Sequence, residues 1–435
     1  MGLKVGSESS GSRFDAYVEA VISALGHADR AVPFRSYCTG LLLPGDRKSV
    51  EPMAARVEPA RVQAAHQSLH HFVAKAEWSD DAVLAAVREL VLPIMARQGP
   101  IRAFIVDDTG MPKKGKHSVG VARQYCGQLG KQDNCQVAVS VSAANDHASL
   151  PLAYRLYLPQ AWADDPARRT KAAVPEDIVF QTKPQIALDQ LRAAVANGTD
   201  AEVVLADAGY GNDTDFRSGI TELGLAYVVG VMSSTSVWAP GTEPLPPKPW
   251  SGNGRPTSAI RRDAGHQPVS AKQMALGLPK KAWRKLTWRE GTNTKLASRF
   301  AAARVRPAHR DYQRNTPRPE EWCLIEWPAG EAEPTKYFLS TLPENISRRD
   351  LVNTTKLRWR IERDYQDLKQ ELGLGHYEGR GWQGFHHHAT LCIAAYGFLI
   401  SERGALPPSG QRQTLCFKKS SLPNSYRPRG STDPA

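Results

Sequence analysis

The sequence has few cysteines, and they do not cluster. Six are scattered along 435 residues, and no two of them form a CxxC pair. This spacing argues against a zinc site or a disulfide framework and favours a reducing cytoplasm. The chain is longer than one compact core usually requires, so we expect two or three domains.

Long apolar segments are also missing. No stretch approaches the roughly 18 uncharged apolar residues of a membrane span. The N-terminus lacks the apolar core of a signal peptide. We therefore expect a cytoplasmic protein without a membrane partner.

Positive charge is present in excess, and it is concentrated. The formal net charge is +12, and residues 255–314 hold fifteen Lys and Arg against three acidic residues. The rest of the chain therefore sums to zero. Such a local excess is typical of a surface that binds a polyanion, although a solvated basic face is the simpler interpretation.

Apolar periodicity predicts a helical region followed by an α/β region. Helical spacing covers 14–25, 59–76 and 80–96, with a loop at 41–53. This region could contact DNA, but it has no clear helix-turn-helix signature, so a role in packing alone stays open as well. Strand-like runs follow at 101–110, 119–125, 136–143, 201–206 and 226–231, with helices at 182–197 and 213–223.

The composition changes after residue 232. Residues 239–256 contain six prolines and predict a linker or irregular loop. Strand-like pieces at 286–288, 296–305, 322–327 and 336–342 predict a small, largely β insertion. Six of the ten tryptophans lie here, and we expect them in its core, although an aromatic ring could also stack on an unpaired base; they are Trp238, Trp250, Trp283, Trp288, Trp322 and Trp327.

The segment 347–372 contains neither Gly nor Pro and predicts one long helix. Ser347 followed by Asp350 is a capping-box pattern. At about 100° per residue, one apolar stripe is formed by Leu357, Ile361, Leu368 and Leu372. The adjacent arc holds Arg358, Glu362, Tyr365 and Lys369, and the far side pairs Arg360 with Asp364 and Arg363 with Asp367 as a solvated face. An ordinary amphipathic helix would show the same pattern. A second helix is expected at 385–402.

Three carboxylates stand out: Asp107 and Asp207 each end a predicted strand, and Glu362 lies on the long helix. Acids at the carboxyl ends of strands lie where α/β sheets bind ligands. Hard oxygen ligands suit Mg²⁺ or Mn²⁺, and two such ions can activate water and stabilise the leaving oxygen of a phosphodiester. A strand-end aspartate alone often only caps a turn.

On these residues the sequence resembles the DDE transposases of bacterial insertion sequences, whose catalytic core is RNase H-like. The helix is similar to their Tyr-x2-Arg-x3-Glu-x6-Lys signature through Arg358, Glu362 and Lys369, but Thr355 stands in the Tyr place. Three further blocks resemble the insertion-sequence family 701 group: Val-Asp-Asp-Thr-Gly-Met-Pro-Lys-Lys-Gly-Lys (106–116), Tyr-Arg-Leu-Tyr-Leu-Pro (154–159) and Leu-Ala-Asp-Ala-Gly-Tyr-Gly (205–211).

The resemblance implies a fold and a function. It implies an RNase H-like mixed sheet with flanking helices, interrupted by the β insertion. It also implies two divalent ions held by Asp107, Asp207 and Glu362, with Arg358 and Lys369 on transposon-end DNA. Asp108 rivals Asp107, which we prefer because the family pattern places Thr or Ser two positions later, as in Thr109. The implied reaction is cut-and-paste transposition into target DNA by two protomers on paired terminal repeats, in a bacterial cytoplasm, associated with the nucleoid when bound.

The expected division follows: a helical region (1–98), the first part of the core (99–232), the basic β insertion (233–343), the second part of the core (344–403) and a disordered basic tail (404–435). Two other functions stay open: an inactive descendant that only binds DNA, and an RNase H-like nuclease without strand transfer.

Two further motifs have simpler interpretations. Residues 110–116 nearly match a phosphate loop, but His117 stands where Ser or Thr should bind Mg²⁺, and Pro112 removes an N–H donor. We expect DNA contacts instead from Lys113, Lys114 and Lys116. Three consecutive histidines point about 100° apart on a helix, so they cannot chelate one ion together; they are His386, His387 and His388. We expect them to pack or face solvent, and the alternative is that one of them faces the active site. Tyr210 is expected to be a turn residue.

Overall fold

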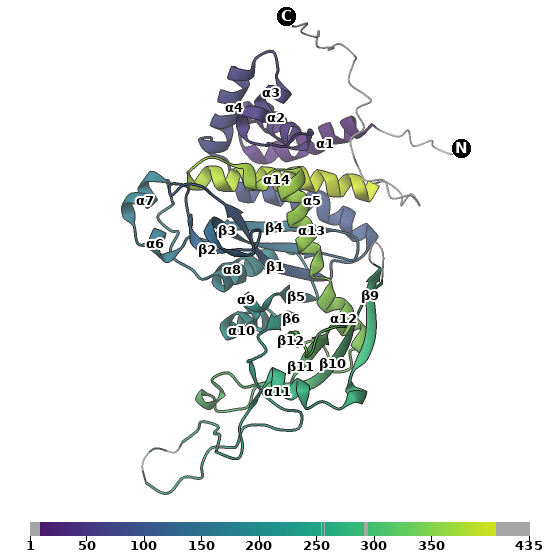
Figure 1. The fold of residues 1–435 in the computed structure, drawn as a ribbon. Helices are drawn as coiled ribbons and strands as arrows, with labels where there is room; N and C mark the ends of the chain where they lie inside the picture. The colour runs from purple at the N-terminus through teal and green to yellow at the C-terminus, as the bar shows by residue number, and fades with distance from the viewer. Residues whose placement is uncertain (1–8, 254, 256, 291–294, 406–435) are drawn as a thin grey trace, which may run out of the picture.

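The structure is a computed structural model that describes residues 9–253, 255, 257–290 and 295–405 (Figure 1). The predicted disordered tail lies outside the described residues from 406 onward. A mixed α/β arrangement is present, with helices gathered at one end and a long sheet below them (Figure 1). In the part of the chain that the structure describes, no helix is long and apolar enough to span a membrane.

The N-terminal region is helical, as predicted, but it holds two more helices than the periodicity showed. Its elements are α1 (Ser10–Ile22), η1 (Ser23–Leu25), η2 (Ala28–Arg30), α2 (Ala31–Leu42), α3 (Val50–Val57), α4 (Val62–Ala74) and α5 (Asp80–Gln98). The last helix, α14 (Trp382–Ala405), lies beside α5, and these two helices separate α1–α4 from the sheet (Figure 1). Because it is covered on both sides, α14 is apolar around most of its circumference.

Of the roles expected for the three histidines on α14, the structure shows packing. His387 stacks on Trp78 with ring centroids 3.7 Å apart, and its Nε2 lies 3.0 Å from the Trp78 carbonyl oxygen. His388 lies 2.9 Å from the Tyr37 hydroxyl. His386 Nε2 accepts from the Leu156 N–H. Burial lowers the pKa of each imidazole to about 4, so all three are neutral packing groups at pH 7.

The central sheet has the RNase H-like order. Its strands are β1 (Ala103–Pro112), β2 (Ala122–Cys126), β3 (Lys131–Ala144), β4 (Ser149–Leu156), β5 (Val203–Ala206) and β6 (Ala226–Val231). β3 pairs antiparallel with β1, β2 and β4, whereas β1, β5 and β6 are parallel. The connecting helices are α6 (Gln160–Ala163), α7 (Pro166–Lys171), α8 (Lys183–Ala196), α9 (Ala208–Gly211) and α10 (Thr214–Glu222). Parallel strands need such crossovers.

The predicted β insertion is present, and its strands continue the core sheet. Its elements are β7 (Ser236–Trp238), β8 (Val269–Ser270), α11 (Ala271–Leu276), η3 (Lys280–Ala282), β9 (Arg284–Glu290), β10 (Lys295–Pro307), η4 (Asp311–Gln313), β11 (Glu321–Trp327) and β12 (Lys336–Ser340). β12 pairs antiparallel with β6, so the insertion begins where the core sheet ends. Trp238 is buried there, as expected, but Trp250 is 59% exposed and does not belong to a core.

The prediction of one continuous helix at 347–372 is wrong. The segment forms α12 (Arg348–Lys356), α13 (Trp359–Gln366) and the π turn η5 (Asp367–Glu371), and the short η6 (Leu374–His376) follows it. At the first break the Leu357 N–H is shared between the carbonyls of Asn353 and Thr354, and the Arg360 N–H bonds back to Leu357. At the second, the Leu372 N–H reaches five residues back to Asp367. No Gly or Pro marks these breaks, so contacts elsewhere in the fold must impose them.

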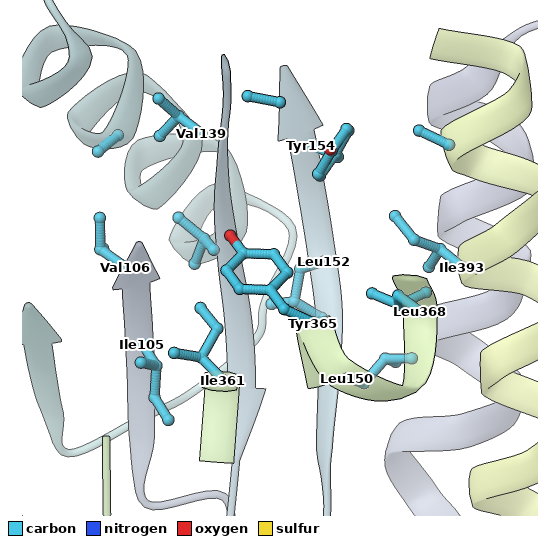
Figure 2. Packing of buried hydrophobic residues seen from close by; sticks show 14 of the residues in the cluster. Ile105, Val106, Val139, Leu150, Leu152, Tyr154, Ile361, Tyr365, Leu368 and Ile393 are labelled. Atoms are coloured by element: carbon cyan, nitrogen blue, oxygen red, sulfur yellow. The ribbon is translucent and has the colours of Figure 1, made fainter. Parts of the chain in front are cut away.

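The apolar stripe of this segment is buried as predicted, and Figure 2 shows Ile361, Tyr365 and Leu368 packed against the sheet. The predicted solvated face is wrong for its two acids, because Asp364 and Asp367 are both buried. Arg363 does pair with Asp367 at 3.1 Å. Asp364, however, is buried, and its Oδ1 accepts from Ser149 Oγ at 2.5 Å and from the Tyr396 hydroxyl at 2.9 Å.

Candidate active site

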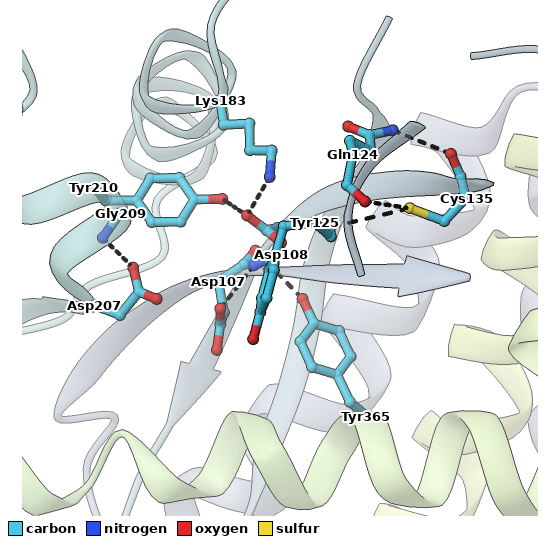
Figure 3. A network of polar contacts seen from close by, with 10 residues as sticks. All are labelled: Asp107, Asp108, Gln124, Tyr125, Cys135, Lys183, Asp207, Gly209, Tyr210 and Tyr365. Atoms are coloured by element: carbon cyan, nitrogen blue, oxygen red, sulfur yellow. Dashed lines mark hydrogen bonds and ion pairs between the residues drawn. The ribbon is translucent and has the colours of Figure 1, made fainter. Parts of the chain in front are cut away.

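Asp107 and Asp207 lie side by side because of strand register. β1 and β5 are parallel neighbours, with Ile105 opposite Leu205. Asp107 lies two residues after Ile105, and Asp207 lies two residues after Leu205. Both side chains therefore point to the same face of the sheet at the same level along the strands. Neighbouring strands lie about 5 Å apart. Figure 3 shows the carboxyl groups of Asp107, on β1, and of Asp207, directly after β5. The sequence predicted both acids at strand ends. Asp207 does follow the last residue of β5, but β1 continues to Pro112, so Asp107 lies within its strand. The register of the two strands brings the acids together.

A tight turn fixes the Asp207 carboxylate. Its Oδ1 accepts the Gly209 N–H at 2.8 Å and so caps α9. A Cβ added at Gly211 would lie 2.0 Å from the Gly230 carbonyl oxygen, so only glycine allows α9 to approach β6 this closely. The Ala-Asp-Ala-Gly-Tyr-Gly block is therefore a packing requirement as well as the frame of a carboxylate.

Arg358, directly before the helix that carries Glu362, connects this helix to Asp107 on β1. One guanidinium nitrogen of Arg358 donates to Asp107 Oδ2 at 2.7 Å, and the other lies 3.4 Å from Glu362 Oε1. Glu362 itself is 66% exposed, whereas Asp107 is 17% exposed. Asp207, Arg358 and Glu362 line one cavity of about 390 Å³. Arg358 thus contacts two of the three predicted carboxylates, and Asp207 lies on the wall of the same cavity.

The electrostatics of the site reflect this crowding. Burial raises the pKa of Asp107 to about 7; Arg358 lowers it, and the charges of Asp207 and Asp108 raise it further. Burial also works against the charged form of Arg358, but Asp107, Asp207 and Glu362 outweigh it and raise the pKa of Arg358. The guanidinium and the carboxylates therefore stabilise one another.

Asp108 points to the opposite face of β1. Its Oδ2 pairs with Lys183 of α8 at 3.0 Å and accepts from the Tyr210 hydroxyl at 3.3 Å (Figure 3). Tyr210 is therefore more than the turn residue that we expected. No sequence pattern indicated the Lys183 contact, because 75 residues separate the partners. The alternation along the strand favours Asp107 over Asp108 as the residue that faces Arg358.

Other signature positions lie on the same side. Lys369 Nζ donates to the Gly110 carbonyl oxygen at 2.9 Å. The Tyr365 hydroxyl lies 2.7 Å from Ser140 Oγ and 3.3 Å from the Asp107 carbonyl oxygen (Figure 3). Thr355, in the Tyr place of the signature, lines the cavity, and its hydroxyl donates to the Leu351 carbonyl.

The predicted DNA-contacting lysines after β1 do not behave alike. Lys113 is partly buried and donates to the Tyr377 carbonyl oxygen at 2.7 Å, whereas Lys114 and Lys116 are exposed. The cavity also holds aromatic residues that the sequence did not assign to the site; they are Trp288, Tyr337, Phe338 and Trp359.

Part of the basic excess in 255–314 is neutralised. Arg262 pairs with the buried Asp311, and Arg304 and Arg306 approach Glu320, an acid just outside the counted segment. The polyanion surface predicted from composition is therefore smaller than the count implied.

The three carboxylates fit a divalent ion by chemistry, since carboxylate oxygens are hard ligands. Their present arrangement does not enclose one: among the described residues, no three His, Cys, Asp or Glu side chains are grouped closely enough to hold a metal. The Arg358 guanidinium contacts two of the three carboxylates instead.

Comparison with known proteins agrees with this geometry. A family model described as DDE superfamily endonuclease matches residues 20–295, a range that includes Asp107 and Asp207 but ends before Glu362. A protein of Microchaete diplosiphon, named as the probable transposase for insertion sequence element IS701, is 34% identical over 169 residues. That match covers 39% of this chain and 41% of the relative, so the two are comparable over less than half of each length. Members of the family generally use divalent metal ions. Because the family model matches more than half of the chain, the protein belongs to the DDE superfamily endonucleases.

Proposed function

We propose that this protein is a DNA transposase that moves an insertion sequence by cut-and-paste transposition. The observation that carries the proposal is that Arg358 pairs with Asp107 and Glu362, while the parallel pairing of β1 with β5 brings Asp207 beside Asp107. Acids brought together from chain positions 100 and 155 residues apart have no packing role that needs all three.

The same proposal assigns roles to the chain's own residues. Asp107, Asp207 and Glu362 would hold two Mg²⁺ or Mn²⁺ ions, which supply water activation and stabilise the leaving oxygen of a phosphodiester when bound. Arg358 lies between carboxylates now, and a guanidinium released from them is well suited to pair with a DNA phosphate. Lys369, beside Gly110, lies on the same side as a second phosphate contact. Lys113, Lys114 and Lys116 would extend these contacts along the DNA.

The partners in this proposal are the terminal inverted repeats, target DNA and a second protomer on the paired end. The freed 3′-hydroxyl of the element would attack a target phosphodiester, with the element's new bond to target DNA replacing the target's own. An RNase H-like nuclease would cut without this transfer, and an inactive descendant would bind without cutting.

The test is Mg²⁺-dependent cleavage and strand transfer on a duplex that carries the inverted repeat bracketing the reading frame. The parent is expected to do both. Asp207→Asn is expected to lose both while keeping the fold, because the turn at Gly209 still finds an oxygen acceptor. Asp215→Asn, at an exposed position in the first turn of α10, is the matched control and should cleave like the parent. Undiminished cleavage by Asp207→Asn would refute the proposal, and cleavage without transfer would favour the nuclease.

A further inference from the structure

A second polar cavity lies away from the carboxylates. Its volume is about 380 Å³, and three distant parts of the chain line it. They are Arg47 and Ser49 before α3, residues 112–114 and 118 at and after the end of β1, and residues 375–378 after the Glu362 segment. The N-terminal helices and the sheet thus share one binding surface here.

The cavity is positively charged. Arg47, Lys113 and Lys114 line it against one acid, Glu378, which pairs with Arg47 at 2.5 Å. The Lys113 ammonium donates one N–H to the Tyr377 carbonyl oxygen, and its other two N–H groups can donate to another acceptor. Ser49 and Ser118 add hydroxyl donors at the wall. Cations and hydroxyls around a pocket of this size suit a phosphate group.

The walls are fixed before any ligand arrives. Asn134 Nδ2 donates to the carbonyls of Lys113 (2.6 Å) and Gly115 (2.9 Å), which holds the loop after β1. The Lys48 N–H donates to His376 Nδ1 at 3.0 Å and ties the N-terminal helices to the segment after the Glu362 helix. Lys48 Nζ is turned inward onto the carbonyls of Leu41 and Leu43. A prepared site of this kind loses little entropy on binding.

Its position links it to DNA. Pro112 follows Asp107 by five residues on β1, about 17 Å along the strand at 3.3 Å per residue. Lys113 is six positions after Asp107, an even number, so along an extended chain both side chains point to the same face of the sheet. Lys369 contacts Gly110, which lies between them. A duplex rises 3.4 Å per base pair, so about five base pairs span this interval.

We infer that this cavity binds a backbone phosphate of the DNA about five base pairs from the cleavage position, with Arg47 and Lys114 as its main contacts. The inference rests on the proposed function and adds to it a contact from the N-terminal helical region. It also predicts that the loop before α3 contacts the DNA backbone and does not contribute to sequence specificity.

The experiment measures how the affinity of the full-length protein for a labelled 30-base-pair duplex depends on salt. Each phosphate contact contributes about 0.9 to the slope of log affinity against log salt. The double variant Arg47→Gln, Lys114→Gln is expected to bind about tenfold more weakly at 0.1 M salt, with a slope reduced by about one. Both side chains are exposed, and circular dichroism checks that the fold is kept.

The matched control is Arg61→Gln, Arg192→Gln, which removes the same charge from two exposed positions. It should keep the parent's slope. Equal losses in both double variants, or an unchanged slope in the first, would overturn the inference while leaving DNA cleavage by the parent intact. If the parent neither binds nor cleaves the duplex, the proposed function fails as well.

Inorganic phosphate separates the two sources of the ligand. Titrated at constant ionic strength, it should bind the parent only weakly, since a DNA contact draws on neighbouring phosphates. Tight binding of inorganic phosphate that is lost in Arg47→Gln, Lys114→Gln, with an unchanged DNA slope, would assign the cavity to a small phosphate compound and contradict the DNA contact.

Discussion

The two aspartates and the glutamate of the candidate site are held in different ways. Asp107 lies within β1 and Asp207 directly follows the neighbouring β5, and backbone register and a glycine turn fix them. Glu362 lies on a short helix between two irregular turns, and its side chain is 66% exposed. We conclude that two acids are placed by the sheet itself, whereas the third reaches them through a segment that can adjust. Local opening is expected where regular hydrogen bonding is interrupted.

The largest expected effect tests the packing of the turn that positions Asp207 after β5. Gly211→Ala would place a Cβ 2.0 Å from the Gly230 carbonyl oxygen, a backbone atom that cannot move aside. We expect the free energy of unfolding to fall by more than about 4 kcal/mol, measured by chemical denaturation. Gly127→Ala, where no atom lies within 4 Å of the added Cβ, should change it by less than about 0.5 kcal/mol. Similar values for both would show that the turn is not tightly packed.

The next effect separates neighbours on one strand. Asp107→Asn should lower DNA cleavage by about 10³-fold, since several kcal/mol of transition-state stabilisation depend on that carboxylate. Asp108→Asn should lower it less than about tenfold, because Asp108 pairs with Lys183 on the other face. Cleavage rates under single-turnover conditions give both numbers. The reverse order would mean that Asp108 is the ligand.

Hydrogen exchange tests whether the segment that carries Glu362 opens more readily than the strands beside the two aspartates. Amides around the break between α12 and α13 should exchange at least about 100-fold faster than those of β1 and β5, because the hydrogen-bond ladder is interrupted at Leu357. Peptide-resolved mass spectrometry measures the rates. Equal protection would show that Glu362 is held as firmly as the aspartates.

The smallest effect concerns the scaffold behind the site, where Asp80 of α5 accepts from the Thr390 hydroxyl of α14 at 2.6 Å. Burial raises the pKa of Asp80 to about 7, an effect that Thr390 opposes and Asp81 adds to, and His387 nearby is neutral. A raised pKa favours the protonated form in the folded state, so stability is lost as pH rises from about 4 through 7. Asp80→Asn should match the parent near pH 4.5 and exceed its free energy of unfolding by about 2 kcal/mol at pH 8. An equal difference at both pH values, measured by denaturation, would exclude this titration.

The sequence predicted the parts of the fold that depend on short segments. The apolar runs that end in Asp107 and Asp207 became β1 and β5, and the capped segment after Thr182 became α8. It missed α2, α3 and β4, whose patterns are short or mixed. It also missed the continuation of the core sheet through β12 and β6, because strand pairing over 100 residues leaves no local pattern.

The site was predicted as a set of residues but not as an arrangement. Charge spacing predicted Asp364 on a solvated face, yet it is buried against Ser149 and Tyr396 because α14 covers that side of the segment. The Arg358 contact with Asp107 depends on the break before α13, which no Gly or Pro announced. Contacts between distant elements therefore decided both features. The roles of the predicted catalytic and DNA-contacting residues stay predictions.

The central claim is that Asp107, Asp207 and Glu362 act on one metal centre. Ferrous ion can replace Mg²⁺ among carboxylates, and with ascorbate and peroxide it releases radicals that cut the nearest backbone. With DNA bound, we predict cuts close to residues 107, 207 and 362 that excess Mg²⁺ suppresses and Asp207→Asn abolishes. Cuts that avoid one of the three positions, or that persist unchanged in Asp207→Asn, would contradict the account.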